Sequence, residues 1–303
     1  MKERIVLAFS GDFETAASIP SLADAHQAEI VTLTLDLGSG RDLEEIRDRA
    51  LAAGAARAHV IDAREEFARD FVLPSLQAGA LQHGRDPMAA ALAGPLVVCK
   101  LAEVAAIEDA RDVIDRSRMD ENLWGRQGNS YRLTKSPEDA PDTPACVEIA
   151  FERGVPAAVN GVPMSMTELI ESVSIIAGHH GVGRIEAAGG RTASCVEAPA
   201  AVVLHAAQAA LESSVLPADV VRAKQQRAAA YADLIADGLW FSPERETMDA
   251  LNAGVQDQVT GSVRIKLFKG TLHTSEAAAL DHPPSPRLRW TSAAAFDGAA
   301  PRP

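Results

Sequence analysis

The sequence is poor in cysteine, in net positive charge and in long apolar runs, and each shortage excludes a class of protein. Its 303 residues contain three cysteines, Cys99, Cys146 and Cys195, which are widely spaced and odd in number. That set argues against a disulfide framework or a cysteine metal cluster, and it predicts reduced thiols of the kind found in a cytoplasm. The formal net charge of −13 argues against nucleic acid and against an anionic membrane as partners.

The hydrophobic residues are distributed as in a globular protein. We see no apolar run of the length of a transmembrane helix, and the N-terminus leads into a strand pattern without a signal-peptide pattern. A hydrophobic content of 47% with 23% charged residues is ordinary for folded domains, and 303 residues allow two domains or one large one. We therefore expect a cytoplasmic globular protein.

The first hundred residues alternate short apolar runs with helical patterns. Three runs are predicted strands: residues 5–9, 30–35 and 59–61. The segments after them have helical patterns, with Pro74 interrupting the third: 15–25, 42–53, 65–80 and 87–106. Strands that alternate with helices of this length predict a parallel sheet with crossover helices.

A turn of small residues joins the first predicted strand to the first helix. Ser10, Gly11 and Asp12 form this turn, and we expect the helix to begin at about Thr15. A helix N-terminus after such a turn favours anion binding, because its first N–H groups lack partners within the helix and the helix dipole is positive there. The alternative is an ordinary connecting turn with Glu14 or Thr15 near the N-cap.

Several segments resemble the argininosuccinate synthase family. The turn has the spacing of the Ser-Gly-Gly-Leu-Asp-Thr-Ser loop of the ATP pyrophosphatases, the group that includes this family. Further segments are similar to family signatures: 60–70 (VIDAREEFARD), 84–95 (GRDPMAAALAGP), 120–126 (DENLWGR) and 136–142 (SPEDAPD). The resemblance covers residues 1–105 and 118–270.

The resemblance implies an α/β fold in two parts. Residues 1–118 would form a shortened, HUP-like parallel-sheet domain of the nucleotide-binding type, and residues 119–274 an α+β synthetase-type domain. The family uses ATP to activate citrulline for attack by aspartate, which gives argininosuccinate in arginine biosynthesis, so ATP and Mg²⁺ are the implied cofactors. The implied nucleotide-binding positions are Ala8, Phe9, Ser10, Gly11, Asp12, Glu14, Thr15 and Leu35.

The turn departs from the family pattern at three positions. Asp12 replaces the second glycine, Glu14 the aspartate and Ala16 the last serine. A Cβ at the second glycine obstructs close approach of a phosphate, and a carboxylate adds repulsion of about several kcal/mol where water is excluded. Mg²⁺ bridging through Asp12 or Glu14 would reverse the sign of this effect.

The implied substrate positions also depart from the family. Gly94 stands where the family has an arginine, and its loss deletes a bidentate carboxylate clamp. The positions implied to contact citrulline or aspartate are Asp86, Ala90, Arg118, Gln127, Gly189 and Val196, and none has the family's residue. We identify no catalytic residue and no metal site, and we expect His179 and His180 to be structural.

The second half predicts a hairpin, several helices and a tail. The hairpin 147–159 turns at Arg153 and Gly154, and a strand is predicted at 260–269. Helices are expected at 167–177, closed by Gly178, and at 197–213, 219–237 and 244–251. Residues 275–303 are Pro-rich and then small and polar, so we expect them to be disordered.

A missing segment bears on association. The family continues the sheet with further strands where this chain has only the charged segment 107–118, so we expect the strand 5–9 to be an edge. Exposed apolar edges invite pairing with another chain, and symmetric self-association is the commonest outcome. A homo-oligomer, or a complex with a full-length paralogue, is therefore expected; residues 107–118 could instead fold back over the edge, but their charges make a poor strand.

Two functional hypotheses follow. The chain keeps the family's core residues and lacks its ligand-binding ones, which favours a non-catalytic paralogue with a partner or scaffold role. The alternative is an active ATP-dependent ligase of the same superfamily with a changed small-molecule substrate. A changed substrate explains Gly94, Gly189 and Val196, but it leaves Asp12 and the missing strands unexplained.

Overall fold

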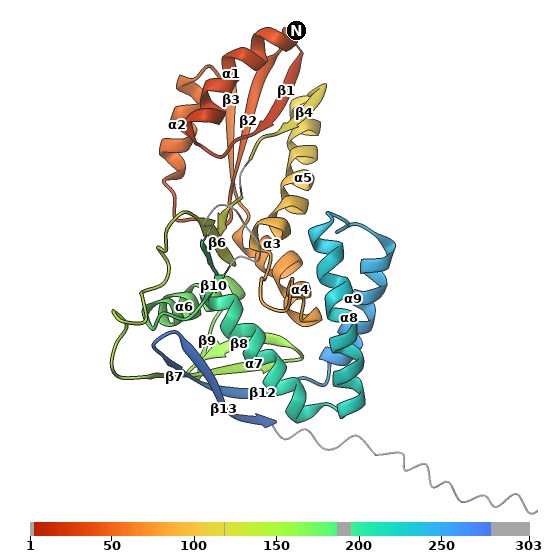
Figure 1. The fold of residues 1–303 in the computed structure, drawn as a ribbon. Helices are drawn as coiled ribbons and strands as arrows, with labels where there is room; N and C mark the ends of the chain where they lie inside the picture. The colour runs from red at the N-terminus through yellow and green to blue at the C-terminus, as the bar shows by residue number, and fades with distance from the viewer. Residues whose placement is uncertain (1–2, 118, 187–194, 280–303) are drawn as a thin grey trace, which may run out of the picture.

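The N-terminal half is a parallel sheet with helices on both faces. A computed structural model describes residues 3–117, 119–186 and 195–279 (Figure 1). Four strands pair in the order β3-β2-β1-β4, all parallel. Their bounds are β1 (Arg4–Ala8), β2 (Glu29–Asp36), β3 (Arg57–Asp62) and β4 (Asp112–Asp115). This confirms the predicted α/β class and the three predicted strands.

Alternate residues of β1 pack on opposite faces of the sheet, as the two-residue period of a strand requires. Ile5 and Leu7 belong to a cluster with residues of α1 (Phe13–His26) and α2 (Leu43–Ala52). Val6 and Ala8 join the main core with residues of the long helix α5 (Ala89–Glu108). Both faces are therefore covered, which is why the run reads as continuously apolar.

The prediction that β1 is an edge strand is wrong. Part of the segment 107–118 does fold back: its strand β4 pairs in parallel with β1 from Ile5↔Asp112 to Ala8↔Asp115. Its charged residues point into solvent because β4 is itself the edge, while Ile114 packs beside the α1–α2 cluster. One inward side chain and the partner strand are enough to order a strand that its own composition disfavours.

The helix predicted at 65–80 is divided into three parts. It consists of α3 (Arg64–Phe67), a π-helical turn η1 (Ala68–Val72) and α4 (Leu73–Ala78). Pro74 lies in the first turn of α4, where a missing N–H is tolerated. Gly79 ends α4 with a left-handed backbone, φ +70°.

The C-terminal half contains two antiparallel sheets. One has the order β10-β11-β6-β5, with bounds Arg184–Glu186, Cys195–Glu197, Gly125–Gly128 and Glu121–Asn122. The other has the order β13-β12-β7-β8-β9, with bounds Thr271–Ala279, Gly261–Phe268, Ala145–Glu152, Val155–Val159 and Val162–Pro163. The predicted hairpin is present as β7 and β8, with Arg153 and Gly154 both at positive φ in its turn.

Four helices accompany these sheets. They are α6 (Met166–His179), α7 (Pro199–Val215), α8 (Ala218–Ala236) and α9 (Pro243–Gln256). Ser165 and Glu168 form a capping box at the start of α6. Gly178 does not close α6 as predicted: it lies within the helix, where a Cβ would come within 2.1 Å of the Leu133 carbonyl oxygen. The glycine is therefore required for close packing and not for ending the helix.

The boundary of the predicted disordered tail is also wrong. Residues 275–279 belong to β13, which pairs with β12 as far as Gly261↔Ala279. Alternation in this segment is masked in the sequence by small residues, since its last three are alanines. The rest of the predicted tail, residues 280–303, lies outside the described residues.

Helix α5 corrects the expectation that the chain has no apolar run of transmembrane length. Within the described ranges, α5 alone has the length and apolar composition of a membrane-spanning helix. Core helices of globular proteins pass the same test, and α5 buries Leu92, Leu96 and Val104 against the sheet and its neighbours. The observation is therefore weak evidence for a membrane segment.

Candidate functional site

The predicted anion turn contains an anion of its own. Asp12 is the N-cap of α1, and its Oδ1 accepts hydrogen bonds from the Thr15 backbone N–H and the Thr15 hydroxyl, both at 2.7 Å. Its Oδ2 accepts from the Ser10 hydroxyl at 2.6 Å. The helix therefore begins at Phe13, ahead of the predicted start, and Glu14 and Thr15 lie near its N-cap, in the first turn.

Basic side chains hold the backbone of this turn from α2 and the loop before it. Arg41 donates to the Ser10 carbonyl oxygen at 2.7 Å, and Arg49 donates to the Gly11 carbonyl oxygen. Gly11 has φ +81°, and a Cβ there would come within 2.7 Å of Ile46. The turn is thus fixed in a shape that only glycine fits without strain.

Some of the polar groups expected to receive a phosphate are engaged within the protein. Three donors that face the turn, one N–H and two hydroxyls, point at the Asp12 carboxylate. An N-cap carboxylate also neutralises part of the positive potential at a helix N-terminus. An incoming phosphate would have to displace Asp12 and accept its repulsion, so these residues do not fit a tightly held polyphosphate.

The other predicted nucleotide positions are close to this turn. Phe9, Ser10 and Leu35 line a small hollow of about 20 Å³ together with Arg41 and Glu121. Ala8 is buried in β1, and Glu14 is exposed in the first turn of α1. In the described chain no group of three His, Cys, Asp or Glu side chains is placed to hold a metal ion.

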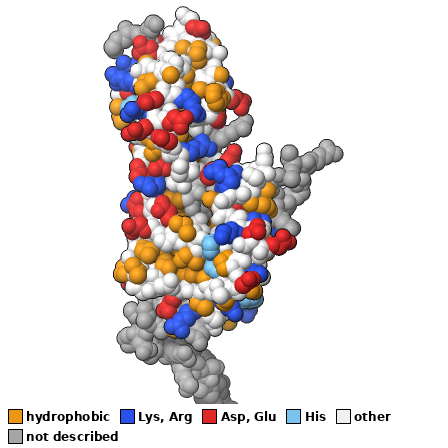
Figure 2. All heavy atoms as spheres, turned by 90° about the vertical axis from the view of Figure 1, so that its left-hand side faces the viewer, with side chains coloured by type: hydrophobic (Ala, Val, Ile, Leu, Met, Phe, Trp, Pro, Cys, Tyr) orange, Lys and Arg blue, Asp and Glu red, His pale blue; other side chains and the backbone are white. Residues whose placement is uncertain are grey.

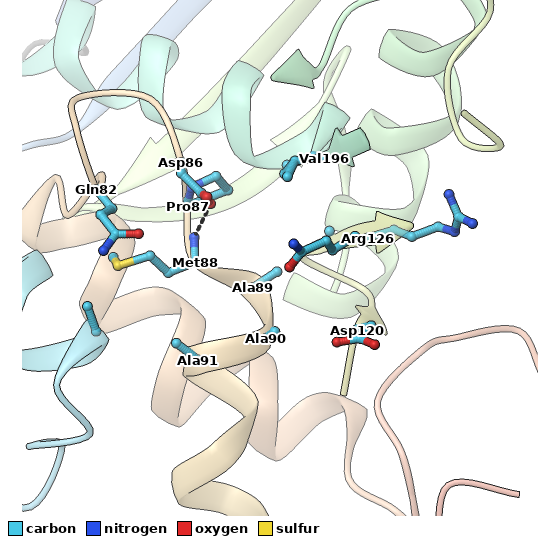
Figure 3. Close-up of a pocket in the computed structure, with 14 residues that line it drawn as sticks. Gln82, Asp86, Pro87, Met88, Ala89, Ala90, Ala91, Asp120, Arg126 and Val196 are labelled. Atoms are coloured by element: carbon cyan, nitrogen blue, oxygen red, sulfur yellow. Dashed lines mark hydrogen bonds between the residues drawn. The ribbon is translucent and has the colours of Figure 1, made fainter. Parts of the chain in front are cut away.

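A second, larger cavity gathers four of the predicted substrate positions. Asp86, Ala90, Gln127 and Val196 line a cavity of about 240 Å³ (Figure 3). They come from the turn before α5, the first turn of α5, β6 and β11, which are far apart in the sequence. Antiparallel pairing of β11 with β6 sets Val196 directly opposite Gln127.

Further residues of this cavity were not predicted. They are Gln82, Pro87, Met88, Ala89, Asp120, Gly125, Arg126, Ala198 and Ala236. Ala91, which stands at another ligand-holding position implied by the family resemblance, also lines the cavity. Ala236 comes from the end of α8, and no local pattern could place it beside α5. Asp120 and Arg126 stand at the ends of the DENLWGR segment, so the motif itself was a usable signal for them.

Most residues that line this cavity are apolar, and two of its charged side chains, Asp86 and Arg126, are engaged with other groups of the protein. The Asp86 carboxylate accepts a hydrogen bond from the Met88 N–H at 2.8 Å. Arg126 extends away from the cavity, and its guanidinium pairs with Glu197 at 3.0 Å (Figure 3). Ala90 and Val196 offer no side-chain hydrogen bond. Among the described residues that line this cavity, a zwitterionic substrate would find no arginine available to hold its carboxylate.

Glu197 fixes the wall that carries Val196. Its carboxylate is fully buried and accepts from Arg126, from the backbone N–H groups of residues 132–134, and from the Thr134 hydroxyl, at 2.7–3.0 Å. Burial raises the pKa of this carboxyl, but these hydrogen bonds outweigh burial and lower its pKa below the ordinary value. The charged form is therefore the stable one.

Three more predicted positions complete the set. Arg118 and Gly189 lie outside the described residues. Gly94, the position of the lost arginine, lies in α5, and a Cβ built there meets nothing within 4 Å. The space for a side chain has remained although the side chain has gone.

Fold and site together define a two-part α/β protein with a HUP-type N-terminal domain. Residues 4–117 match the model of the arginosuccinate synthase N-terminal HUP domain, and residues 114–279 match that of the C-terminal domain. The chain belongs to the argininosuccinate synthase family.

Curated relatives agree with this assignment. The chain is 35% identical to the argininosuccinate synthase of Rubrobacter xylanophilus, with 89% of this chain and 84% of the relative aligned. It is 34% identical to that of Symbiobacterium thermophilum, over 89% and 86% of the two chains. The first alignment spans 344 positions and this chain has 303 residues, so parts of that relative have no counterpart here.

Proposed function

We propose that this chain is a non-catalytic member of the family that acts as a partner, regulatory or scaffold subunit. The observation that carries the proposal is the position of the Asp12 carboxylate, which occupies the Ser10 and Thr15 donors of the anion turn. Family membership supports ATP as the ligand to test, with Mg²⁺ as its counterion. The geometry counts against tight binding, because phosphate and Asp12 compete for the same donors.

The larger cavity supports the same proposal. The family reaction, ligation of citrulline and aspartate, needs its carboxylates held, since such catalysis depends on positioning and charge stabilisation. Ala90 and Val196 cannot hydrogen-bond through their side chains, and Arg126 is paired with Glu197. A partner role requires the folded scaffold but not the side chains that bind substrate.

Two measurements test this proposal. Calorimetric titration with ATP·Mg²⁺ should give no saturable binding at micromolar concentration. An assay with ATP, citrulline and aspartate should release no AMP or pyrophosphate above a control without protein. Micromolar ATP affinity would refute our account of the turn, and product release would refute the loss of activity.

A changed substrate is the second candidate, and the cavity itself favours it. The first turn of α5 lines a space of about 240 Å³ and has no side-chain cap, so its N–H groups could receive a carboxylate. Under this hypothesis the protein would release AMP or pyrophosphate from ATP when a suitable acid is supplied. A screen of small carboxylic acids for pyrophosphate release separates the two candidates.

Location and assembly are also proposals. The charge of −13 and the reduced cysteines support a cytoplasmic protein without a nucleic-acid or membrane partner. A homo-oligomer, or a complex with a full-length paralogue, remains our proposal on the general ground that soluble chains most often self-associate symmetrically. The unpaired β1 edge no longer supports it, since β4 covers that strand.

A further inference from the structure

A second concavity lies behind the turn that borders the larger cavity, which we call the substrate cavity because four of the predicted substrate positions line it. It is a groove of about 620 Å³ between α7, β10 and residues 81–87. Its apolar walls include Leu81, Ile185, Val202 and Ala206. Pro87 borders both the groove and the substrate cavity, so one turn of the chain separates the two spaces.

The charged side chains of this groove are opposite in sign to the net charge of the chain. The chain has 42 acidic and 29 basic residues, yet the described residues that line the groove include two arginines, Arg85 and Arg184, and no carboxylate. Arg184 is held in place, because it donates to the Thr134 hydroxyl and carbonyl oxygens at 3.0 and 2.8 Å and lies over the Tyr131 ring. Arg85 is exposed, and within the described residues its guanidinium makes no hydrogen bond or ion pair.

The wall formed by α7 includes an unsatisfied histidine. His205 is 8% exposed and tilts against Trp124, with ring centroids 5.8 Å apart. Its Nε2 has no hydrogen-bond partner in the described structure. Burial, with a smaller effect of Lys224, lowers the pKa of His205 to about 3. The ring is therefore neutral, and this wall of the groove carries no charge that would lose hydration when an apolar group is bound.

We propose that this groove binds a small organic anion with an apolar body, a carboxylate whose branched or aromatic side chain lies on α7 while Arg85 pairs with its carboxylate. Apolar walls with a few convergent polar groups are the usual composition of a ligand site. A guanidinium is the side chain best suited to a carboxylate, which it can engage with two parallel hydrogen bonds. The proposal does not depend on whether the chain is catalytic.

The test uses the full chain and 4-methylpentanoate as the probe. We expect saturable binding by calorimetry with a Kd on the order of 1 mM, as a ligand of this size allows. The neutral amide of the same acid should bind at least about tenfold more weakly, since it lacks the charge that Arg85 recognises. Acetate, which has no apolar body, should not bind detectably.

Variants locate the site. Arg85→Ala should weaken binding about tenfold, and Ala206→Trp should abolish it by filling the groove. Arg222→Ala, at an exposed arginine of α8 outside the groove, is the matched control and should leave binding unchanged. Val196→Trp, which fills the other cavity, should leave the probe bound.

Four outcomes would overturn the proposal, the first three of them in the binding of the probe itself. These three are the absence of saturable binding to protein that circular dichroism shows to be folded, equal binding of the acid and its amide, and binding that persists in Ala206→Trp. Loss of binding in Val196→Trp alone would place the acid in the substrate cavity and would also overturn it. None of these outcomes bears on ATP binding, which the titration of the anion turn measures separately.

Discussion

A single residue, Asp12, decides whether the donors of the turn are available to an anion or are bonded within the protein. Its carboxylate accepts three hydrogen bonds that would otherwise be offered to a phosphate. The sequence identified Asp12 as an obstruction because of its Cβ and its charge. The structure adds that the residue is also the helix cap, so it stabilises the fold while it opposes the ligand.

Replacing Asp12 should therefore raise the affinity for ATP while it lowers the free energy of unfolding. We expect Asp12→Gly combined with Ala16→Ser to improve ATP affinity at least about tenfold, because a repulsive charge is removed and a hydroxyl donor is added. Loss of the cap should cost up to about 1 kcal/mol of unfolding free energy. Calorimetry and urea unfolding measure the two effects.

Asp42→Gly provides the matched control. Asp42 caps α2 in the same way, through a hydrogen bond from the Glu45 N–H at 3.0 Å, but it lies outside the anion turn. This variant should lose similar stability and gain no ATP affinity. Equal affinities of the two variants would mean that Asp12 does not control access to the turn.

Glu197 predicts a dependence of stability on pH. Glu197→Gln should destabilise the protein by about 2–4 kcal/mol at pH 7, since it removes a buried charge that Arg126 and several N–H groups require. Because the folded pKa lies below the unfolded one, the stabilisation is complete above the unfolded value, near pH 4.5, and is lost as pH falls through the folded pKa.

Urea unfolding at pH 7 and at pH 3 measures this effect. The difference between wild type and Glu197→Gln should narrow at the lower pH, while Glu152→Gln, at an exposed residue of β7, should change little at either. A difference that stays constant with pH would show that the charge of Glu197 is not what stabilises the loop.

At the scale of elements, the sequence predicted what depends on local pattern. The strands and helices of the first hundred residues were found because apolar runs and caps are local signals, and Asp42, the predicted start of the second helix, is its N-cap. Gly79 was not used as a signal, so the predicted third helix ran past its end. The strand β4 was disfavoured because its charges dominate a four-residue segment. Its order comes from pairing with β1, which no local pattern contains.

The site was predictable to the same extent. The family resemblance named Asp86, Ala90, Gln127 and Val196, and these four share one cavity. It did not name Ala236, which reaches the cavity only through the packing of α8. The internal bonds of Asp12 could not be read either, since they depend on the path of the turn in space.

The strand β13 gives a prediction at this scale. A chain that ends after Ala279 should melt within about 2 °C of the full chain, since residues 280–303 are Pro-rich and then small and polar. A chain that ends after Thr274 loses the pairing of residues 276–279 with β12, and it should melt about 5 °C lower or more. Scanning calorimetry on both compares them directly. Equal melting temperatures would mean that this end of β13 contributes nothing to the fold.

At the scale of the whole molecule, the surface bears on assembly. Acidic, basic and hydrophobic side chains are mixed over the upper part of the face in Figure 2, and a further group of hydrophobic ones lies lower down. The exposed apolar side chains include Ile175 on α6, which lines a hollow with Leu133. The edge strand β4 is less suited to pairing, because a two-fold antiparallel pair would set Asp112 opposite Asp115 of the second copy.

Light scattering should therefore find a dimer or larger assembly at micromolar concentration. Ile175→Arg should weaken it, since a charge would replace an apolar contact, while Val113→Lys on the β4 edge should not. Amide exchange along Ile5 to Ala8 should be slow in both variants, because β2 and β4 flank β1. A monomeric wild type would remove self-association from the proposal and leave the paralogue as the partner.

The turn shared by the two cavities has a thermodynamic consequence. Pro87 lines both cavities, and the neighbouring Asp86 accepts a hydrogen bond from the N–H of Met88, the N-cap of α5. If an acid in the groove changes the position of this turn, it changes the affinity of the substrate cavity by some factor. Linkage then requires a ligand of the substrate cavity to change the affinity of the groove by the same factor. Either ligand can report on the other, so a titration of the groove becomes an assay for whatever the substrate cavity binds.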